Sequence, residues 1–317
     1  MSRRTEVRTA EHAAVVRAPA DLVHGLLAAT AGWPAVFPSF VHTRDLGPGP
    51  AGSRRVGMWT ASDGAVHPWV ALCTRHPAER RVDFRPEVLP PGLDDLVRSW
   101  LVEARTEHGS VVRLRHRYRP ATTDADAVSE LERQIESIAT AEVGACVEAA
   151  EQRAGRPELL LVLRDRAAVR GPVGDAYAFL RDVKGWAAHV PHVAAVSVAG
   201  PDPDAGTAEV DVLGPRGVVR TRVARVCLAP DTVVQKQLLL PPLARLHRTV
   251  WSLRATATGT EVATEHQVLL APEGIAAVLG AGAGVADAEA FVRQEVGGKG
   301  QALVEALRRV VEAHGVR

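Results

Sequence analysis

Two histidines lie in runs of alternating residues, and histidine is the side chain best suited to move protons near neutral pH. His116 lies in VVRLRHRYRP (111–120). Because successive side chains of a strand point to opposite faces, His116 shares an apolar face with Leu114 and Tyr118. His266, in TEHQVLL (264–270), holds the corresponding place later in the chain. Each histidine could carry protons in a cleft, or it could be a hydrogen-bonded core residue.

Arg225 is the third residue with chemical potential. In VVRTRVARVCL (218–228), alternation places it on one face with Val223 and Cys227, so it is a lone cation in a weakly polar row. A buried guanidinium needs an acidic partner or a polar ligand, because an unpaired buried charge costs several kcal/mol. A shift of the strand register by one residue would instead leave Arg225 on the surface. Weaker ionisable candidates are His42, His67, His192, Lys236 and His247.

These residues belong to a chain that repeats itself. Pro19, Gly32, Trp33 and Pro38 recur at matching spacing as Pro172, Gly185, Trp186 and Pro191, and LPP (89–91) recurs at 240–242. Order and spacing both persist, which indicates a duplicated domain. We therefore predict two domains, 1–155 and 156–317.

Each half has the same order of expected elements. A short strand precedes a helix that begins at proline, then a Trp/Pro-rich segment, several alternating strands and a long amphipathic helix. This order predicts an α+β fold in which an antiparallel curved sheet wraps around the final helix and leaves an internal cavity. In the last helix, GGKG (297–300) either thins the helix where a ligand approaches or breaks it.

Composition excludes several classes of protein. The 317 residues carry a net charge of +1, with 46% hydrophobic and 24% charged residues, so nothing favours nucleic acid or a membrane as partner. No apolar stretch has the length of a signal peptide core or a membrane span. Three cysteines without a CxxC pair fit a reducing compartment. We expect a cytoplasmic protein.

Several short motifs, in order, carry a family resemblance. They are GWPAVFPSFVH (32–42), VPHVA (190–194), ARVCLAP (224–230), LPP (240–242) and TEHQVLL (264–270). The chain thereby resembles the didomain aromatase/cyclases of bacterial type II polyketide synthases, which have tandem START-like, helix-grip domains. The resemblance implies aldol cyclisation and dehydration of the first ring of a poly-β-ketone held on an acyl carrier protein. It implies work alongside the other synthase components, without a metal or cofactor.

The resemblance also suggests which side chains matter. Family members commonly carry Trp-x-Ser-x-Arg where this chain has Trp69, Ala71 and Cys73, so the Ser/Arg pair is missing. Arg75 has the same strand parity, about 7 Å further along, and is the candidate substitute. This departure indicates an altered role for the first domain. Arg225 matches an arginine of the family's second domain.

The predicted catalytic residues are Arg225, His266 and His116. The predicted substrate-binding residues are Trp69, Trp33, His42, Arg75, Tyr118, Trp251 and His192. A flat aromatic wall would suit a planar polyketide, although large aromatic side chains also fill cores, which is the favoured role of Trp33. The alternative to an enzyme is a non-catalytic partner that binds and folds the polyketide. The ladder Arg113, Arg115, Arg117 and Arg119 could meet an acidic carrier protein or be a solvated strand face.

Overall fold

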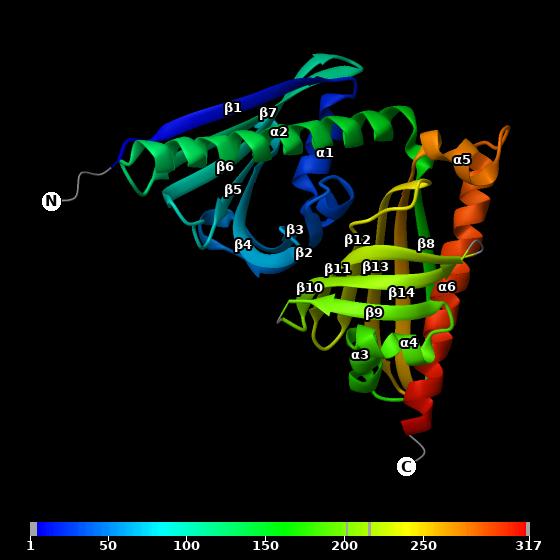
Figure 1. The fold of residues 1–317 in the computed structure, drawn as a ribbon. Coiled ribbons are helices and arrows are strands. Elements are labelled where there is room, and N and C mark those ends of the chain that lie inside the picture. The colour runs from blue at the N-terminus through cyan, green and yellow to red at the C-terminus, as the bar shows by residue number, and fades with distance from the viewer. Residues whose placement is uncertain (1–4, 201, 215–216, 315–317) are drawn as a thin grey trace. The chain divides into compact units, whose positions relative to one another are not determined.

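The computed structural model describes residues 5–200, 202–214 and 217–314. The chain divides into two units, Met1–Trp59 with Pro68–Pro157 and Thr60–His67 with Glu158–Arg317. Each unit is built on a seven-stranded antiparallel sheet and one long helix, so the predicted α+β, tandem helix-grip fold is confirmed (Figure 1). Residues 60–62 and 65–67 belong to strands of the first sheet, although the division groups 60–67 with the second unit.

The first unit is a meander whose last long strand returns to the first. Its sheet order is β1-β7-β6-β5-β4-β3-β2. Its elements are β1 (Arg8–Val16), α1 (Ala20–Ala28), β2 (Phe40–Pro48), β3 (Arg54–Ser62), β4 (Ala65–His76), β5 (Arg81–Pro86), β6 (Leu93–Thr106), β7 (Gly109–Pro120) and α2 (Ala125–Gly155). Asp124 caps α2, because its carboxylate accepts the Ala127 N–H at 2.8 Å. The helix then runs along β1 and β7 (Figure 1).

The second unit repeats this plan, with the sheet order β8-β14-β13-β12-β11-β10-β9. Its elements are β8 (Leu160–Val169), α3 (Val173–Arg181), α4 (Trp186–His189), β9 (Val193–Ala199), β10 (Ala205–Gly214), β11 (Gly217–Leu228), β12 (Thr232–Gln237), β13 (Ala244–Thr256), β14 (Gly259–Leu270), α5 (Ile275–Leu279) and α6 (Val285–His314). Helix α6 runs through the glycines 297–300 without interruption, so the expectation that they break it is wrong.

Both long helices are tethered in the same way near their C-terminal ends. The backbone N–H of Arg17 donates to Glu151 at 3.0 Å in the first unit, and that of Arg170 donates to Glu312 at 3.1 Å in the second. Each arginine side chain also pairs with the same glutamate. The matching tethers fix how residues of α2 and α6 correspond.

The interior of the second unit contains two separate apolar clusters along α6. One gathers Leu303, Leu307 and Val311 with Trp186 and Trp251. The other gathers Ala288 and Val292 of α6 with Leu243, Val268 and Leu270. The stretch of α6 between them contains the glycines, and polar side chains of the sheet lie opposite that stretch.

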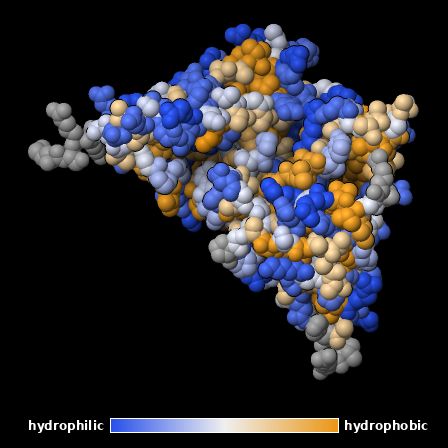
Figure 2. All heavy atoms as spheres, in the orientation of Figure 1, coloured by the Kyte–Doolittle hydropathy of each residue, from blue (hydrophilic) through white to orange (hydrophobic). Residues whose placement is uncertain are grey.

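The surface is mixed in character. On the face drawn in Figure 2, hydrophobic residues form separate patches between hydrophilic ones. No helix within the described residues is long and apolar enough to cross a membrane.

Candidate functional site

Strand register aligns four polar residues across the inner face of the second sheet. Arg225 on β11 lies opposite Gln235 on β12, Gln235 opposite Thr249 on β13, and Thr249 opposite His266 on β14. We call these four residues the second-unit row. Arg225, Thr249 and His266 are each at most 6% exposed. Two of the predicted catalytic residues therefore lie in one row, on the face that α3, α4 and α6 cover.

Neutral groups hold Arg225 in place. Its Nη1 donates to Gln235 Oε1 at 2.7 Å and its Nη2 to the backbone oxygen of Leu180 at 2.6 Å. The guanidinium also lies over the ring of Trp186, 4.8 Å from the ring centroid. Burial lowers the pKa of Arg225, yet arginine keeps its proton at neutral pH. Of the two expected ways to hold this cation, an acidic partner or a polar ligand, neither is used directly: two neutral oxygens and a π face fix the cation without neutralising it.

His266 stands at the other end of the row. Its Nδ1 lies 3.0 Å from Thr249 Oγ1 and 3.4 Å from His247 Nε2, whereas its Nε2 is buried without a hydrogen-bond partner among the described residues. Burial lowers the pKa of His266 to about 4, so the ring is neutral at pH 7. A neutral imidazole with one free nitrogen can accept or donate a proton there.

Other polar atoms of this interior also lack partners. Four further buried atoms have no hydrogen-bond partner within the described part of the chain. They are Tyr177 Oη, Gln237 Oε1, Trp251 Nε1 and Thr264 Oγ1. Gln237, Trp251 and Thr264 lie on the same face of the sheet as the row. Buried polar atoms are normally hydrogen-bonded, so this concentration marks the interior beside the row as a candidate ligand site.

A groove reaches this region from one side of the unit. Its volume is about 500 Å³, and it is lined by residues of β8, β14 and α6, including Asp165, Thr264, Gly298 and Gly300. A Cβ at Gly300 would lie 3.1 Å from His266 Nε2, so the bare backbone of α6 passes directly over the imidazole. A second groove, of about 580 Å³, lies at the C-terminal end of α2 and is lined by Arg17, Glu151 and neighbouring residues.

The first unit has a matching row with different chemistry. Register aligns Cys73 on β4, Phe84 on β5, Arg98 on β6 and His116 on β7, which we call the first-unit row. Cys73 thus holds the place of Arg225, and Arg98 holds the place of Thr249. Each row contains one guanidinium, but on a different strand.

Arg98 is already committed to neighbours inside the first unit. Its Nε donates to His116 Nε2 at 3.0 Å, and its Nη2 pairs with Glu142 of α2. Because His116 Nε2 accepts, the proton of the neutral ring lies on Nδ1, which is buried without a partner among the described residues. Burial and Arg98 lower the pKa of His116 to about 3.

Aromatic rings fill the adjoining interior of the first unit. Trp33 packs against Phe37, Phe40 and Phe84 with ring centroids 4.6–5.1 Å apart, and its Nε1 donates to Leu27 O at 3.1 Å. Trp69 is partly buried against the same core. These contacts make Trp33 a core residue, as Trp186 is in the second unit, where Nε1 donates to Phe179 O.

The remaining predicted residues do not converge on one point. His42 lies beside Trp59, with ring centroids 5.4 Å apart, and Arg75 is exposed. Tyr118 is buried, with its hydroxyl 3.5 Å from Glu132. Trp251 packs edge-on to Trp186 in the second unit.

His192 completes the predicted set. It is half-buried just before β9, and burial together with Lys299 of α6 lowers its pKa.

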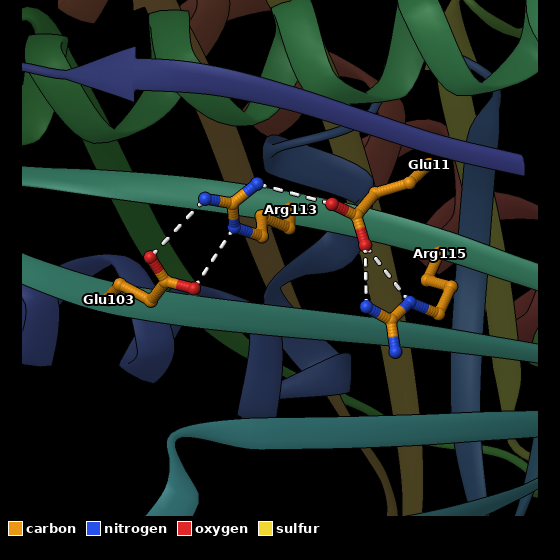
Figure 3. Close-up of polar contacts among 4 residues, drawn as sticks. All are labelled: Glu11, Glu103, Arg113 and Arg115. Carbon is orange, nitrogen blue, oxygen red and sulfur yellow. Dashed lines mark hydrogen bonds and ion pairs between the residues drawn. The ribbon is translucent and has the colours of Figure 1, made fainter.

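The arginine ladder of β7 is largely neutralised by its own neighbours. Glu11 bridges Arg113 and Arg115, and Glu103 accepts from Arg113 at 3.0 Å (Figure 3). Asp95 pairs with Arg117 at 2.9 Å. These pairs favour a solvated strand face over a free basic docking patch.

Sequence reasoning missed Gln235, Thr249, Thr264 and Arg98. Each lies on a strand whose local sequence has no distinguishing feature, and only the pairing between strands brings it beside the other residues. The available signal was alternation, which put Thr264 on the face of His266, but nothing local specified the partner strands. Among the described residues, no group of three or more His, Cys, Asp or Glu side chains could hold a metal ion.

Comparison with known proteins adds the context for this site. The chain is 32% identical, over 97% of its length and 94% of that protein, to the granaticin polyketide synthase bifunctional cyclase/dehydratase of Streptomyces violaceoruber. It is also 32% identical, over 99% of both chains, to the actinorhodin polyketide synthase bifunctional cyclase/dehydratase of Streptomyces coelicolor. No protein-family model matches it.

A solved structure extends the similarity to the fold. The di-domain ARO/CYC BexL from the BE-7585A biosynthetic pathway is 33% identical and has a TM-score of 0.90, covering 96% of this chain and 99% of that one.

Proposed function

The chain belongs to the family of polyketide synthase bifunctional cyclase/dehydratases, enzymes of the didomain aromatase/cyclase type, and from this premise we propose that its second unit closes and dehydrates the first ring of a poly-β-ketone. The substrate would be presented by an acyl carrier protein of the type II polyketide synthase system to which the enzyme belongs. The buried polar atoms beside the second-unit row that have no partner among the described residues carry the proposal. Ketone oxygens of the substrate can accept from Tyr177 Oη, Trp251 Nε1 and Thr264 Oγ1, and a hydroxyl or enol group can donate to Gln237 Oε1.

Ring closure needs a stabilised oxyanion and a group that accepts a proton. A methylene carbon between two ketones loses a proton and attacks a ketone carbon further along the chain. The new C–C bond forms as the C=O π bond breaks, and the oxygen takes up the electron pair and then a proton. Dehydration afterwards removes a proton from the adjacent carbon and the hydroxyl group, as one water molecule.

Arg225 suits the first requirement. Its contacts with Gln235, Leu180 and Trp186 hold the guanidinium rigid before substrate binds. Because these contacts do not exhaust the five N–H donors of the guanidinium, donors remain for a ketone oxygen that becomes negative.

His266 suits the second requirement. In the tautomer whose Nδ1 donates to Thr249 Oγ1, the neutral ring presents Nε2 as the proton acceptor, and this is the tautomer the proposal requires. Three strand spacings, about 14 Å of backbone separation, lie between Arg225 and His266, so the two contact different positions of a long substrate. The proposal therefore assigns charge stabilisation to Arg225 and proton transfer to His266.

The duplicated rows supply a matched control for the test. The enzyme is combined with the synthase components and a ketoreduced poly-β-ketone, and products are compared for wild type, His266→Gln and His116→Gln. Loss of a general base lowers the rate by about 10²–10⁴-fold. We expect that loss for His266→Gln. His116→Gln should keep the wild-type product, because Arg98 already occupies His116 Nε2.

Circular dichroism and urea unfolding establish that both variants fold. A His266→Gln enzyme that forms the ring product at the wild-type rate would overturn the assignment.

A further inference from the structure

The groove between β8, β14 and α6 has a closed counterpart in the first unit. We propose that this groove is the port through which the ligand enters the second unit, and that a His12–Glu136 pair holds the matching place of the first unit shut. The inference rests on the proposed function, because it takes the second-unit row as the destination of the ligand.

The two units can be compared residue by residue along their long helices. Glu312 occupies the place of Glu151, because both accept the backbone N–H of an equivalent arginine. Counting back equally along the two unbroken helices puts Gly297 at the place of Glu136 and Gly300 at that of Ala139.

The edge strands correspond through their register. Ala10 of β1 lies opposite His116, and Leu163 of β8 lies opposite His266. Two residues further along each strand, on the same face, are His12 and Asp165.

In the first unit these positions join the sheet to the helix. His12 Nε2 lies 2.6 Å from Glu136 Oε2, which ties the edge strand β1 to α2. In the second unit the corresponding residues are Asp165 and Gly297, and glycine supplies no side chain to close the pair. Within the described residues nothing lies within 4 Å of the place a Gly297 Cβ would occupy. The lining of the groove includes Asp165 and Gly298, the neighbour of Gly297.

Two buried atoms indicate what the groove admits. Thr264 lines it and is 4% exposed, and its hydroxyl has no partner in the described part of the chain. His266 Nε2, also without one there, lies one strand pleat beyond, beneath Gly300. A hydroxyl donor at Thr264 followed by an accepting imidazole nitrogen at His266 suits a ligand that offers a ketone or hydroxyl oxygen to the first and a hydroxyl or acidic methylene hydrogen to the second. We therefore assign the port to the poly-β-ketone chain and its hydroxylated aromatic product.

Building the His12–Glu136 pair of the first unit into the second unit tests the assignment. The double variant Asp165→His/Gly297→Glu places the same pair across the groove. The probe is 1,8-dihydroxyanthraquinone, and its binding is followed in a stopped-flow instrument through quenching of tryptophan fluorescence. His266→Gln identifies the kinetic phase that belongs to the second unit.

A closed port slows entry and exit alike. We expect the association and dissociation rates to fall together by about tenfold, with Kd changed by less than about threefold, because a required opening step precedes binding. Gly298→Trp fills the groove whether or not the introduced side chains pair, and it should slow both association and dissociation as well. Gly297→Ala adds no reach across the groove and serves as the matched control with wild-type rates.

Two results would overturn the port. One is wild-type rates in both Asp165→His/Gly297→Glu and Gly298→Trp. The other is a raised Kd with an unchanged association rate, which would mean that these positions contact the bound probe and do not gate its entry. Neither result depends on ring formation, whereas the proposed function fails only if His266→Gln keeps the wild-type product.

Discussion

Gly300→Ala separates the stability of α6 from the function of the residue beneath it. Alanine is favoured over glycine within a helix by about 1 kcal/mol. The new Cβ would lie 3.1 Å from His266 Nε2, closer than the 3.4 Å at which ordinary contact begins, so the ring must move by a few tenths of an ångström. Moving it strains the hydrogen bond to Thr249, worth about 1 kcal/mol. The two effects cancel, and the expected change in the free energy of unfolding is near zero.

The control is Gly297→Ala, whose Cβ meets no described atom within 4 Å. It should gain the full helix preference of about 1 kcal/mol, a rise in Tm of about 2–4 °C. Calorimetry measures both variants, and the reconstituted synthase measures product. A ring displaced from the substrate should cost Gly300→Ala at least about tenfold in rate while Gly297→Ala keeps wild-type activity. If Gly300→Ala gained as much Tm as Gly297→Ala and formed product normally, the placement of His266 against the backbone of α6 would be refuted.

Three further perturbations address the two rows. Burial lowers the pKa of His266 from 6.5 to about 4, so the unfolded chain takes up the proton first as the pH falls. The free energy of unfolding should therefore decrease between pH 6.5 and 4, by up to about 3 kcal/mol. His266→Gln should flatten this pH dependence in urea titrations, and an unchanged slope would contradict the shift. Glu142→Gln leaves the largely buried Arg98 side chain without its carboxylate and should cost about 3 kcal/mol in urea unfolding. Most of this loss should be recovered by adding Arg98→Met, and equal losses in the single and double variants would exclude the ion pair as the cause. Arg225→Lys keeps the charge but cannot make both bonds of the guanidinium, so calorimetry should show a loss of about 2 kcal/mol, and wild-type stability would contradict the contacts described.

Local sequence patterns specify the architecture of this chain well. The strict alternation of β14, in which every second residue from Thr260 to Leu270 is buried, is visible in the sequence because one face of the strand packs on the interior and the other faces outward. The duplication then supplies the second sheet from the first. Prolines at the helix starts and the long apolar stripes of α2 and α6 have equally local causes.

The chemistry of the interior depends on register, which local patterns do not contain. The sequence predicts that Arg225 needs an acidic partner or a polar ligand, yet Gln235 and a backbone oxygen hold it, because β12 and α3 bring them there. Arg98 reads as one surface charge among many, and only its alignment with His116 shows that the first unit has an internal guanidinium after all. The glycines of α6 suggest a helix break, because helix propensity does not account for the tertiary packing that stabilises a helix.

The two rows also limit how the interior of the first unit could be converted into that of the second by substitution. Placing an arginine at position 73 would put two cations about 10 Å apart in a medium of low dielectric constant, where they repel each other. The Arg98 side chain would first have to be replaced by a neutral one. The order of the two substitutions therefore matters, and the effect of an arginine at position 73 depends on which residue stands at position 98.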